Sequence, residues 1–219
     1  MKRQCIGGII FDLDGVLIDS TACHRTAFQM VFAGHGIRDF DYAAYAGWRT
    51  PEVVVDVFRR AGICSDPAGV AETARRKSRL ARELIAEKKP LTEGCPGVLR
   101  ELAGQYRLAL ATSGSRAAVE AFLDLAGCHA LFSSVLSGED VTHAKPDPEI
   151  YRRTIEALGI LSDDCVVVED AVAGVEAACR AGARVVGILG TCQEEMLSKA
   201  GACQVIHGLP ELPMLLSTL

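Results

Sequence analysis

Two kinds of hydrophobic pattern alternate along this chain of 219 residues. Short runs rich in β-branched residues and leucine predict strands, and longer segments with helical periodicity lie between them. Strands are expected at 6–11, 107–111, 134–136, 165–168, 184–189 and 204–206. Helices are expected at 95–104, 115–127, 147–159, 171–181, 192–200 and 209–219. This alternation predicts an α/β fold in which helices cover both faces of a parallel sheet.

The segment 17–90 interrupts the alternation, because it contains no convincing strand. Its periodicity predicts helices at 20–34, 39–46, 51–61 and 67–88, separated by breaks that are rich in glycine and proline. A turn-rich stretch at 90–97 then returns the chain to the strand–helix pattern. We therefore expect a core domain formed by residues 1–16 and 92–219 and an inserted helical domain formed by residues 17–91.

Composition narrows the class of protein. Hydrophobic residues make up 49% of the chain, which is enough for a sizeable core. No apolar run is long enough for a signal sequence or a membrane span, and a net charge of −5 gives no reason to expect nucleic acid. Nine cysteines without a C-x-x-C pair argue against a zinc site or a disulfide framework. The expectation is a soluble, cytoplasmic protein with reduced thiols.

The charges are unevenly distributed. Residues 17–90 contain 12 Lys and Arg against 9 Asp and Glu, a net charge of +3, whereas the remainder contains 11 against 19, a net charge of −8. A basic insertion above an acidic body suits a metal site covered by something that attracts anions. The favoured interpretation of the basic run itself is a solvated helix face, formed by Arg75, Arg76, Lys77, Arg79 and Arg82.

Two aspartates follow the first predicted strand. Residues two apart in extended backbone point the same way, so Asp12 and Asp14 are expected to face one side while Leu13 turns into the core. Two carboxylates this close repel each other and need a cation or a proton nearby. Hard divalent cations with oxygen ligands meet that need. The alternative is a polar turn with two solvated aspartates.

Three further strand ends carry polar residues. The turn at 111–116 offers hydroxyls and amides at a helix start, which suits a phosphate or an ordinary N-cap. Lys145 stands next to two prolines, where it can neutralise a phosphoryl oxygen or lie at the surface. Glu169 and Asp170 close an apolar strand, where they can supply the remaining metal ligands or an N-cap acid.

In their order along the chain, these four segments resemble the four motifs of the haloacid dehalogenase superfamily. The matching segments are DLDGVLIDS, ATSGSR, AKPDPEIY and VVVEDAVAGVEAACRAG. The resemblance covers the whole chain, since the insertion looks like the superfamily's type-one helical cap. Within the superfamily, the chain is most similar to the beta-phosphoglucomutase-like branch of small-metabolite phosphatases and mutases. The resemblance implies a three-layer, Rossmann-like parallel sheet with an inserted all-helical cap domain.

The resemblance also implies a role for each motif residue. Asp12 would be the nucleophile that forms an aspartyl-phosphate, and Asp14 the general acid and base. Lys145 would balance charge. Phosphoryl binding would fall to Thr112 with the amide of Ser113, and Mg²⁺ would be bound by Asp12, the backbone carbonyl of Asp14, Glu169 and Asp170.

Rival functions on the same fold differ in their residues. Dehalogenases of the superfamily work without metal and lack the second aspartate. The presence of Asp14 therefore argues against a dehalogenase. Phosphonate-cleaving relatives use a cap lysine, and the chain has no lysine between Lys2 and Lys77. A non-catalytic regulator that binds metal and phosphate would not need Asp12 beside Asp14. A phosphatase acting on a small phosphorylated metabolite is favoured over these three functions. The protein is expected to be a monomer or a weak homodimer.

A mutase is harder to exclude than these functions. It would require a second phosphate-binding site. Where the sugar mutase has a Lys-Asn pair, this chain has Ser115 and Arg116, a departure that favours the phosphatase. Trp48 and Arg49 follow a glycine in the cap, where they are expected to shape substrate choice. The alternative for Trp48 is that it packs between cap helices. Candidate substrate-binding residues for this second site are His24, Arg49 and Thr50 in the cap and Ser115 and Arg116 on the core side.

Overall fold

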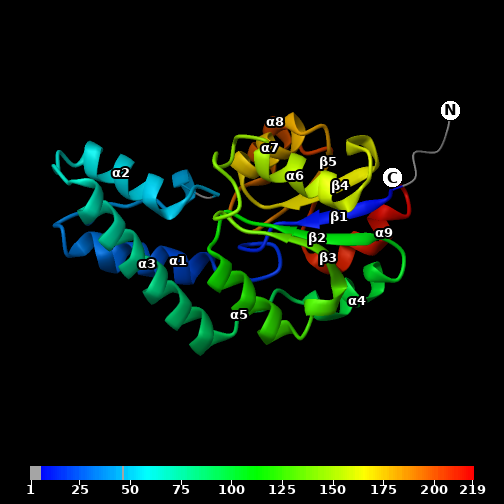
Figure 1. The fold of residues 1–219 in the computed structure, drawn as a ribbon, viewed down its shortest axis with the longest axis horizontal. Coiled ribbons are helices and arrows are strands. Elements are labelled where there is room, and N and C mark those ends of the chain that lie inside the picture. Colours follow the sequence, from blue (N-terminus) through cyan, green and yellow to red (C-terminus); the bar gives the residue numbers. More distant parts are fainter. Residues whose placement is uncertain (1–5, 46) are drawn as a thin grey trace.

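The computed structural model describes residues 6–45 and 47–219 of the chain. Six parallel strands form one sheet in the order β3-β2-β1-β4-β5-β6 (Figure 1). Their bounds are Gly8–Phe11 for β1, Arg107–Ala111 for β2, Phe132–Leu136 for β3, Cys165–Glu169 for β4, Arg184–Ile188 for β5 and Gln204–Ile206 for β6. The six predicted strands are therefore confirmed, with ends that differ by at most two residues.

Alternation along the strands creates two apolar faces. Ile9 and Phe11 belong to one buried cluster and Ile10 to another, as a side-chain period of two requires. Helices α4 (Cys95–Ala103), α5 (Arg116–Ala126) and α9 (Leu212–Leu216) cover the first face. Helices α6 (Glu149–Leu158), α7 (Val172–Arg180) and α8 (Glu194–Ala200) cover the second (Figure 1). The predicted three-layer α/β fold is confirmed.

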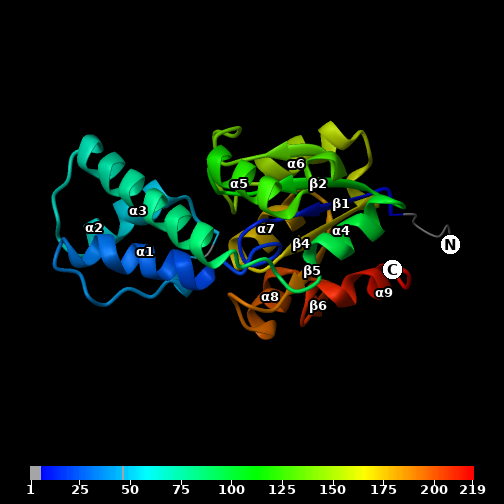
Figure 2. The ribbon, with the colours of Figure 1, turned by 90° about the horizontal axis from the view of Figure 1, so that it is seen from below.

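The long crossover between β1 and β2 carries helices α1 (Thr21–Ala33), α2 (Thr50–Arg60) and α3 (Pro67–Lys88), which lie beyond one end of the sheet (Figures 1 and 2). These helices bury an apolar cluster of their own. The start of α3 follows from local chemistry, because Asp66 accepts a hydrogen bond from the amide of Gly69 (2.8 Å) and Pro67 fits the first helical position. The predicted inserted helical cap is thereby confirmed, as are three of its helices.

Two predicted helices are wrong in part. The helix expected at 39–46 is only a 3₁₀ turn at Ala43–Tyr45, and residue 46 lies outside the described residues. The side chain of Asp41 accepts from the amide of Ala43 (3.0 Å), a local bond that competes with the helix. At the C-terminal end, the helix expected at 209–219 is split into a 3₁₀ turn, Leu209–Glu211, and α9. The described helices are too short or too polar to cross a membrane.

The two connections between the sheet and the inserted helices run side by side. Ile18 and Leu91 form an isolated antiparallel bridge. The amide of Asp19 donates to the carbonyl of Pro90 (2.8 Å), and the amide of Thr92 donates to that of Leu17 (3.1 Å). The chain therefore leaves and re-enters the core at one place. The domain boundaries at 16/17 and 91/92 remain a prediction.

Candidate active site

The candidate site lies at the carboxyl ends of the central strands. Asp12 directly follows β1, Glu169 ends β4, and the amide of Asp12 donates to the carbonyl of Val168 (3.0 Å). The strand order reverses between β1 and β4, which is where open α/β sheets form a ligand crevice. The position expected from the sequence is therefore the one at which the acidic residues gather.

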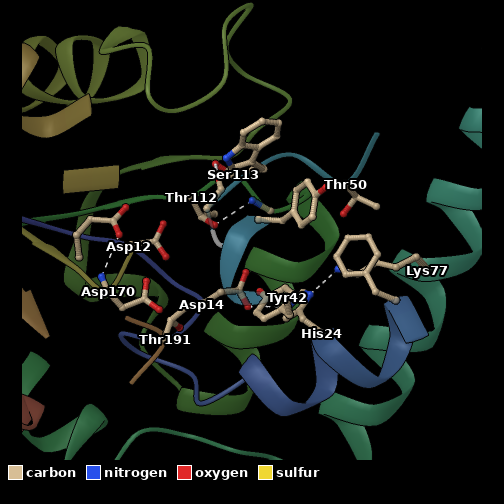
Figure 3. Close-up of a pocket in the computed structure, with 16 residues that line it drawn as sticks. Asp12, Asp14, His24, Tyr42, Thr50, Lys77, Thr112, Ser113, Asp170 and Thr191 are labelled. Carbon is tan, nitrogen blue, oxygen red and sulfur yellow. Dashed lines mark hydrogen bonds and ion pairs between the residues drawn. The ribbon is translucent and has the colours of Figure 1, made fainter. Parts of the chain in front are cut away.

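The inserted helices close this edge into a small pocket of about 60 Å³. Asp12, Asp14 and Asp170 lie on the side of the sheet, and His24 and Lys77 face them from α1 and α3 (Figure 3). Hydroxyl-bearing residues and four aromatic rings complete the lining: Thr50, Thr112, Ser113, Thr191, Phe28, Tyr42, Tyr45 and Trp48.

A buried lysine joins two carboxylates beneath the pocket. The ammonium of Lys145 lies 2.7 Å from Asp12 Oδ1 and 2.7 Å from Glu169 Oε1. Glu169 Oε1 also accepts from the hydroxyl of Tyr151 (2.8 Å), and Oε2 accepts from the amides of Asp170 and Ala171. Burial alone would lower the pKa of Lys145, but the charges of Asp12 and Glu169 hold that pKa well above its ordinary value.

Asp12, Glu169 and Asp170 are more buried carboxylates than the single charge of Lys145 can balance. Burial raises the pKa of Asp12 to about 7 despite the attraction of Lys145. Burial, and then the charges of Glu169 and Asp12, raise the pKa of Asp170 well above its ordinary value. Such a pair strongly favours either a proton or a cation.

The backbone around Asp170 leaves space for its carboxylate. Gly15 has a φ of +86°, and a Cβ at that position would lie 1.8 Å from Asp170 Oδ2. A glycine is therefore required both for the turn and for the carboxylate that packs against it. Buried carboxylate oxygens held in this way fit a hard divalent cation such as Mg²⁺. All four predicted metal ligands line the pocket, although both oxygens of Glu169 are already engaged by protein donors.

Asp14 ends a chain of polar contacts that reaches into the cap. His24 Nε2 lies 2.9 Å from Asp14 Oδ1, and His24 Nδ1 lies 2.6 Å from the ammonium of Lys77. An ammonium can only donate, so Nδ1 accepts and the Nε2–H donates to Asp14. Ser20 donates to the same carboxylate oxygen. Burial would raise the pKa of Asp14, but His24 and Ser20 together lower it below its ordinary value.

Lys77 differs from its neighbours in the basic run. It is buried, 3% exposed, and its ammonium lies 4.2 Å from the centre of the Phe28 ring. Burial lowers the pKa of Lys77 to about 8. The interpretation of the run as a solvated face is wrong for this residue. The helical spacing contains the missed signal, since Lys77 shares one face of α3 with the buried residues Thr73 and Ala81.

The turn after β2 forms another part of the pocket lining. Thr112 Oγ1 accepts from the amide of Gly114 (2.9 Å), and Ser115 caps α5 by accepting from the amide of Ala118. The hydroxyl of Ser113 donates to the carbonyl of Gly47 in the cap (2.8 Å). Thr112 and Ser113 therefore lie where the sequence places a phosphate cradle, and Ser113 also fastens the cap to the core.

Three candidate substrate-binding residues do not line this pocket, namely Arg49, Ser115 and Arg116. Arg116 pairs with Asp140 (2.5 Å). Arg49 donates to the carbonyls of Val141 (2.7 Å) and Thr142 (3.0 Å), which ties the cap to the loop after β3.

Several pocket residues were placed imperfectly or missed by the sequence reasoning. Trp48 is 40% exposed, contacts the Tyr45 ring edge-on and lines the pocket, so it is not packed between cap helices. Tyr42 and Thr191 were missed, because neither lies in a motif and each approaches the site only through the fold.

Comparisons with known proteins identify the family. The family model described as haloacid dehalogenase-like hydrolase matches residues 6–182. This chain belongs to the haloacid dehalogenase-like hydrolases. The resemblance predicted from the four motifs is therefore confirmed, and the chain is a hydrolase by family.

Three named proteins are similar to this chain. Fructose-1-phosphate phosphatase YqaB of Escherichia coli is 29% identical, with 80% of this chain and 92% of the relative covered. Validoxylamine A 7'-phosphate phosphatase of Streptomyces hygroscopicus is 31% identical, with coverage of 87% and 89%. The crystal structure of CbbY from Rhodobacter sphaeroides in complex with phosphate is 30% identical with a TM-score of 0.81, covering 94% and 96%. Each of these matches covers 80% or more of this chain.

Proposed function

We propose that this chain is a magnesium-dependent phosphatase that hydrolyses a small phosphorylated metabolite, such as a sugar phosphate, through an aspartyl-phosphate. The observation that carries the proposal is the arrangement of Asp12 and Asp14 in one closed pocket. Asp12 is held by a buried lysine, and Asp14 is hydrogen-bonded to a histidine. The names of two relatives, both phosphatases of phosphorylated sugars or sugar-like compounds, support the same reaction.

Asp12 and Asp14 divide the chemistry between them. A carboxylate oxygen of Asp12 attacks phosphorus, the phosphoester bond breaks, and Asp14 gives a proton to the leaving alkoxide. Asp14 then takes a proton from a water molecule, which attacks the aspartyl-phosphate and releases phosphate and free Asp12. Two phosphoryl transfers thus replace one direct hydrolysis.

The lowered pKa of Asp14 suits the second of these steps directly, because an ionised carboxylate is a base. For the first step Asp14 must be protonated. The arrival of a negatively charged phosphate beside Asp14 raises the pKa of its carboxyl group, since like charges disfavour the ionised form. The substrate itself therefore shifts Asp14 toward the acid form.

The remaining pocket residues bind and neutralise the phosphoryl group. Thr112 and the amide of Ser113 would bind its oxygens, and Lys145 would balance the charge of Asp12. Asp12 and Asp170 would hold Mg²⁺ with the carbonyl of Asp14, while Glu169 positions Lys145 and completes the acidic surroundings of the ion. When bound, the ion offsets the negative charge that builds up on the phosphoryl oxygens.

The mutase alternative lacks support at its second phosphate site. Arg116, the position expected to bind a distal phosphate in a mutase, is paired with Asp140 and lies away from the pocket. In the proposed reaction the cap would exclude bulk water during the first transfer and admit one water molecule for the second.

Release of phosphate from a panel of phosphorylated metabolites tests the proposal. Wild-type protein with Mg²⁺ is compared with samples containing EDTA and with Asp12→Asn. We expect release that requires Mg²⁺ and disappears in the variant. Isomerisation of beta-glucose 1-phosphate without release would instead make the protein a mutase, and inactivity on every substrate would favour a binding protein.

A further inference from the structure

The buried carboxylate of Asp170 has a neighbour that lies outside the four motifs. Thr191 stands in the loop after β5, and β5 lies next to β4, whose last residue precedes Asp170. Both side chains approach Gly15, where a Cβ would lie 1.8 Å from Asp170 Oδ2 and 3.0 Å from Thr191 Oγ1. The carboxylate and the hydroxyl therefore lie side by side in the pocket (Figure 3).

The hydroxyl of Thr191 also contacts the cap. Its Oγ1 lies 3.1 Å from Oγ1 of Thr21, which is the first residue of α1. On the side of the core, a hydrogen bond from Thr191 opposes the rise in the pKa of Asp170 that burial causes. Thr191 therefore links a buried carboxylate of the core to the start of a cap helix.

The chemistry of the three groups fixes the direction of these hydrogen bonds. A carboxylate that holds a cation is ionised, so Asp170 can only accept. Thr191 has a single hydroxyl hydrogen, so it donates that hydrogen to Asp170 and accepts from Thr21. Hydrogen bonds linked in a row polarise and strengthen one another where water is excluded. A change at either end of the row is therefore felt at the other.

We propose that Thr191 is a positioning residue that orients Asp170 toward the metal and couples the metal site to the position of α1. The inference rests on the proposed function, because it requires that Asp170 binds Mg²⁺. Lys145 holds Asp12 from within the core, and Thr191 would hold Asp170 in a comparable way. Because such coupling is reciprocal, a cap helix placed against Thr191 favours metal binding, and a bound metal favours that placement.

Calorimetric titration of Mg²⁺ into the protein without substrate tests the role of Thr191. Thr191→Val nearly keeps the shape of the side chain and removes its hydroxyl. We expect it to bind Mg²⁺ about tenfold more weakly, as is typical when the partner of a metal ligand is lost. Thr191→Ser keeps the hydroxyl and should bind the ion nearly as tightly as wild type.

Thr21→Val tests the link to the cap. It should bind Mg²⁺ about two- to fourfold more weakly, because only the mutual strengthening of the two hydrogen bonds is lost. Since Thr21 would act only through Thr191, the double variant should bind no more weakly than Thr191→Val alone. Thr26→Val is the matched control on α1. Its hydroxyl donates to the carbonyl of Ala22 in the same helix, so its loss should leave the affinity unchanged.

Wild-type affinity in Thr191→Val would overturn the proposal. Losses for Thr21→Val and Thr191→Val that multiply in the double variant would also contradict it, because independent sites behave in that way. Equal weakening in Thr191→Ser would indicate disturbed packing rather than a missing hydroxyl, and would be equally fatal.

Phosphate release by wild-type protein, with Mg²⁺ and with EDTA, tests the proposed function separately. If release requires Mg²⁺ while Thr191→Val binds the ion as tightly as wild type, the phosphatase stands and the role of Thr191 falls. If wild-type protein neither binds Mg²⁺ nor releases phosphate, both are overturned.

Discussion

Replacement of Lys77 by methionine should stabilise the protein while lowering its activity. The folded protein holds the pKa of Lys77 at about 8, against an ordinary value of 10.5, because burial disfavours the ammonium. That difference corresponds to a cost of about 3 kcal/mol for keeping the charged lysine in the folded state at neutral pH. Methionine has a similar length and no charge to desolvate. The value already includes the attraction between Lys77 and Asp14, but the loss of the hydrogen bond from Lys77 to His24 offsets part of the gain, so we expect an increase of about 2 kcal/mol in the free energy of unfolding.

The stability difference between wild type and Lys77→Met should depend on pH, because the pKa of Lys77 differs between the folded and unfolded states. Below pH 8 the lysine is charged in both the folded and the unfolded states, so the full cost is present. Between pH 8 and 10.5 the folded protein binds fewer protons than the unfolded chain, so wild-type stability rises with pH relative to the variant. Above 10.5 the lysine is neutral in both states, and the advantage of methionine should vanish.

Urea denaturation of wild-type protein and Lys77→Met at pH 7 and pH 10 measures the effect. Lys88→Met, an exposed position on the same helix, is the matched control and should change stability little at either pH. Phosphate release at pH 7 should fall in Lys77→Met, because His24 loses the donor that fixes its orientation toward Asp14. A less stable Lys77→Met protein at pH 7, or a stability difference that does not narrow with rising pH, would refute the reasoning.

Three further substitutions test other parts of the site. Gly15→Ala should weaken activation by Mg²⁺ roughly 10- to 100-fold, because the new Cβ would meet Asp170, whereas Gly36→Ala, with no atom within 4 Å, should not. Equal activation curves for the two variants would contradict this. Lys145→Met should reduce the free energy of unfolding by roughly 3–5 kcal/mol in urea titrations, because it leaves buried carboxylates without their cation, and an unchanged midpoint would contradict it. Arg49→Ala should lower kcat/KM, because the cap loses two hydrogen bonds to the core; unchanged values for every substrate would rule the role out.

The fold was largely predictable from sequence because its signals are local. Buried parallel strands such as Cys165–Val168 are continuous apolar runs, and turns rich in glycine and proline separate them from helices. The predicted helix at 39–46 failed because apolar residues there serve a different purpose. Phe40 packs against Phe28 and Phe32 with ring centres 5.1 and 5.0 Å apart, in a segment without regular secondary structure that sequence periodicity does not distinguish from a helix.

The residues of the candidate site were likewise predictable in part. The motif residues at the strand ends could be predicted to gather, because parallel strands end at one edge of the sheet. The contact between Lys77 and His24 could not, since it depends on how α1 and α3 pack within the cap. The pairing of Arg116 with Asp140 was equally hidden, because it joins the start of α5 to the loop that follows β3.

The bridge between Ile18 and Leu91 has a consequence for how this enzyme family can diversify. Because the two connections emerge together, the sheet experiences the insertion as one closed loop, and each doubling of its length costs only about 0.6 kcal/mol in closure entropy. The insertion also carries an apolar cluster of its own, although Leu17, Ile18 and Ile85 pack in the cluster beneath the sheet. Evolution can therefore lengthen, shorten or exchange the inserted helices while the strand ends that form the proposed active site keep their geometry.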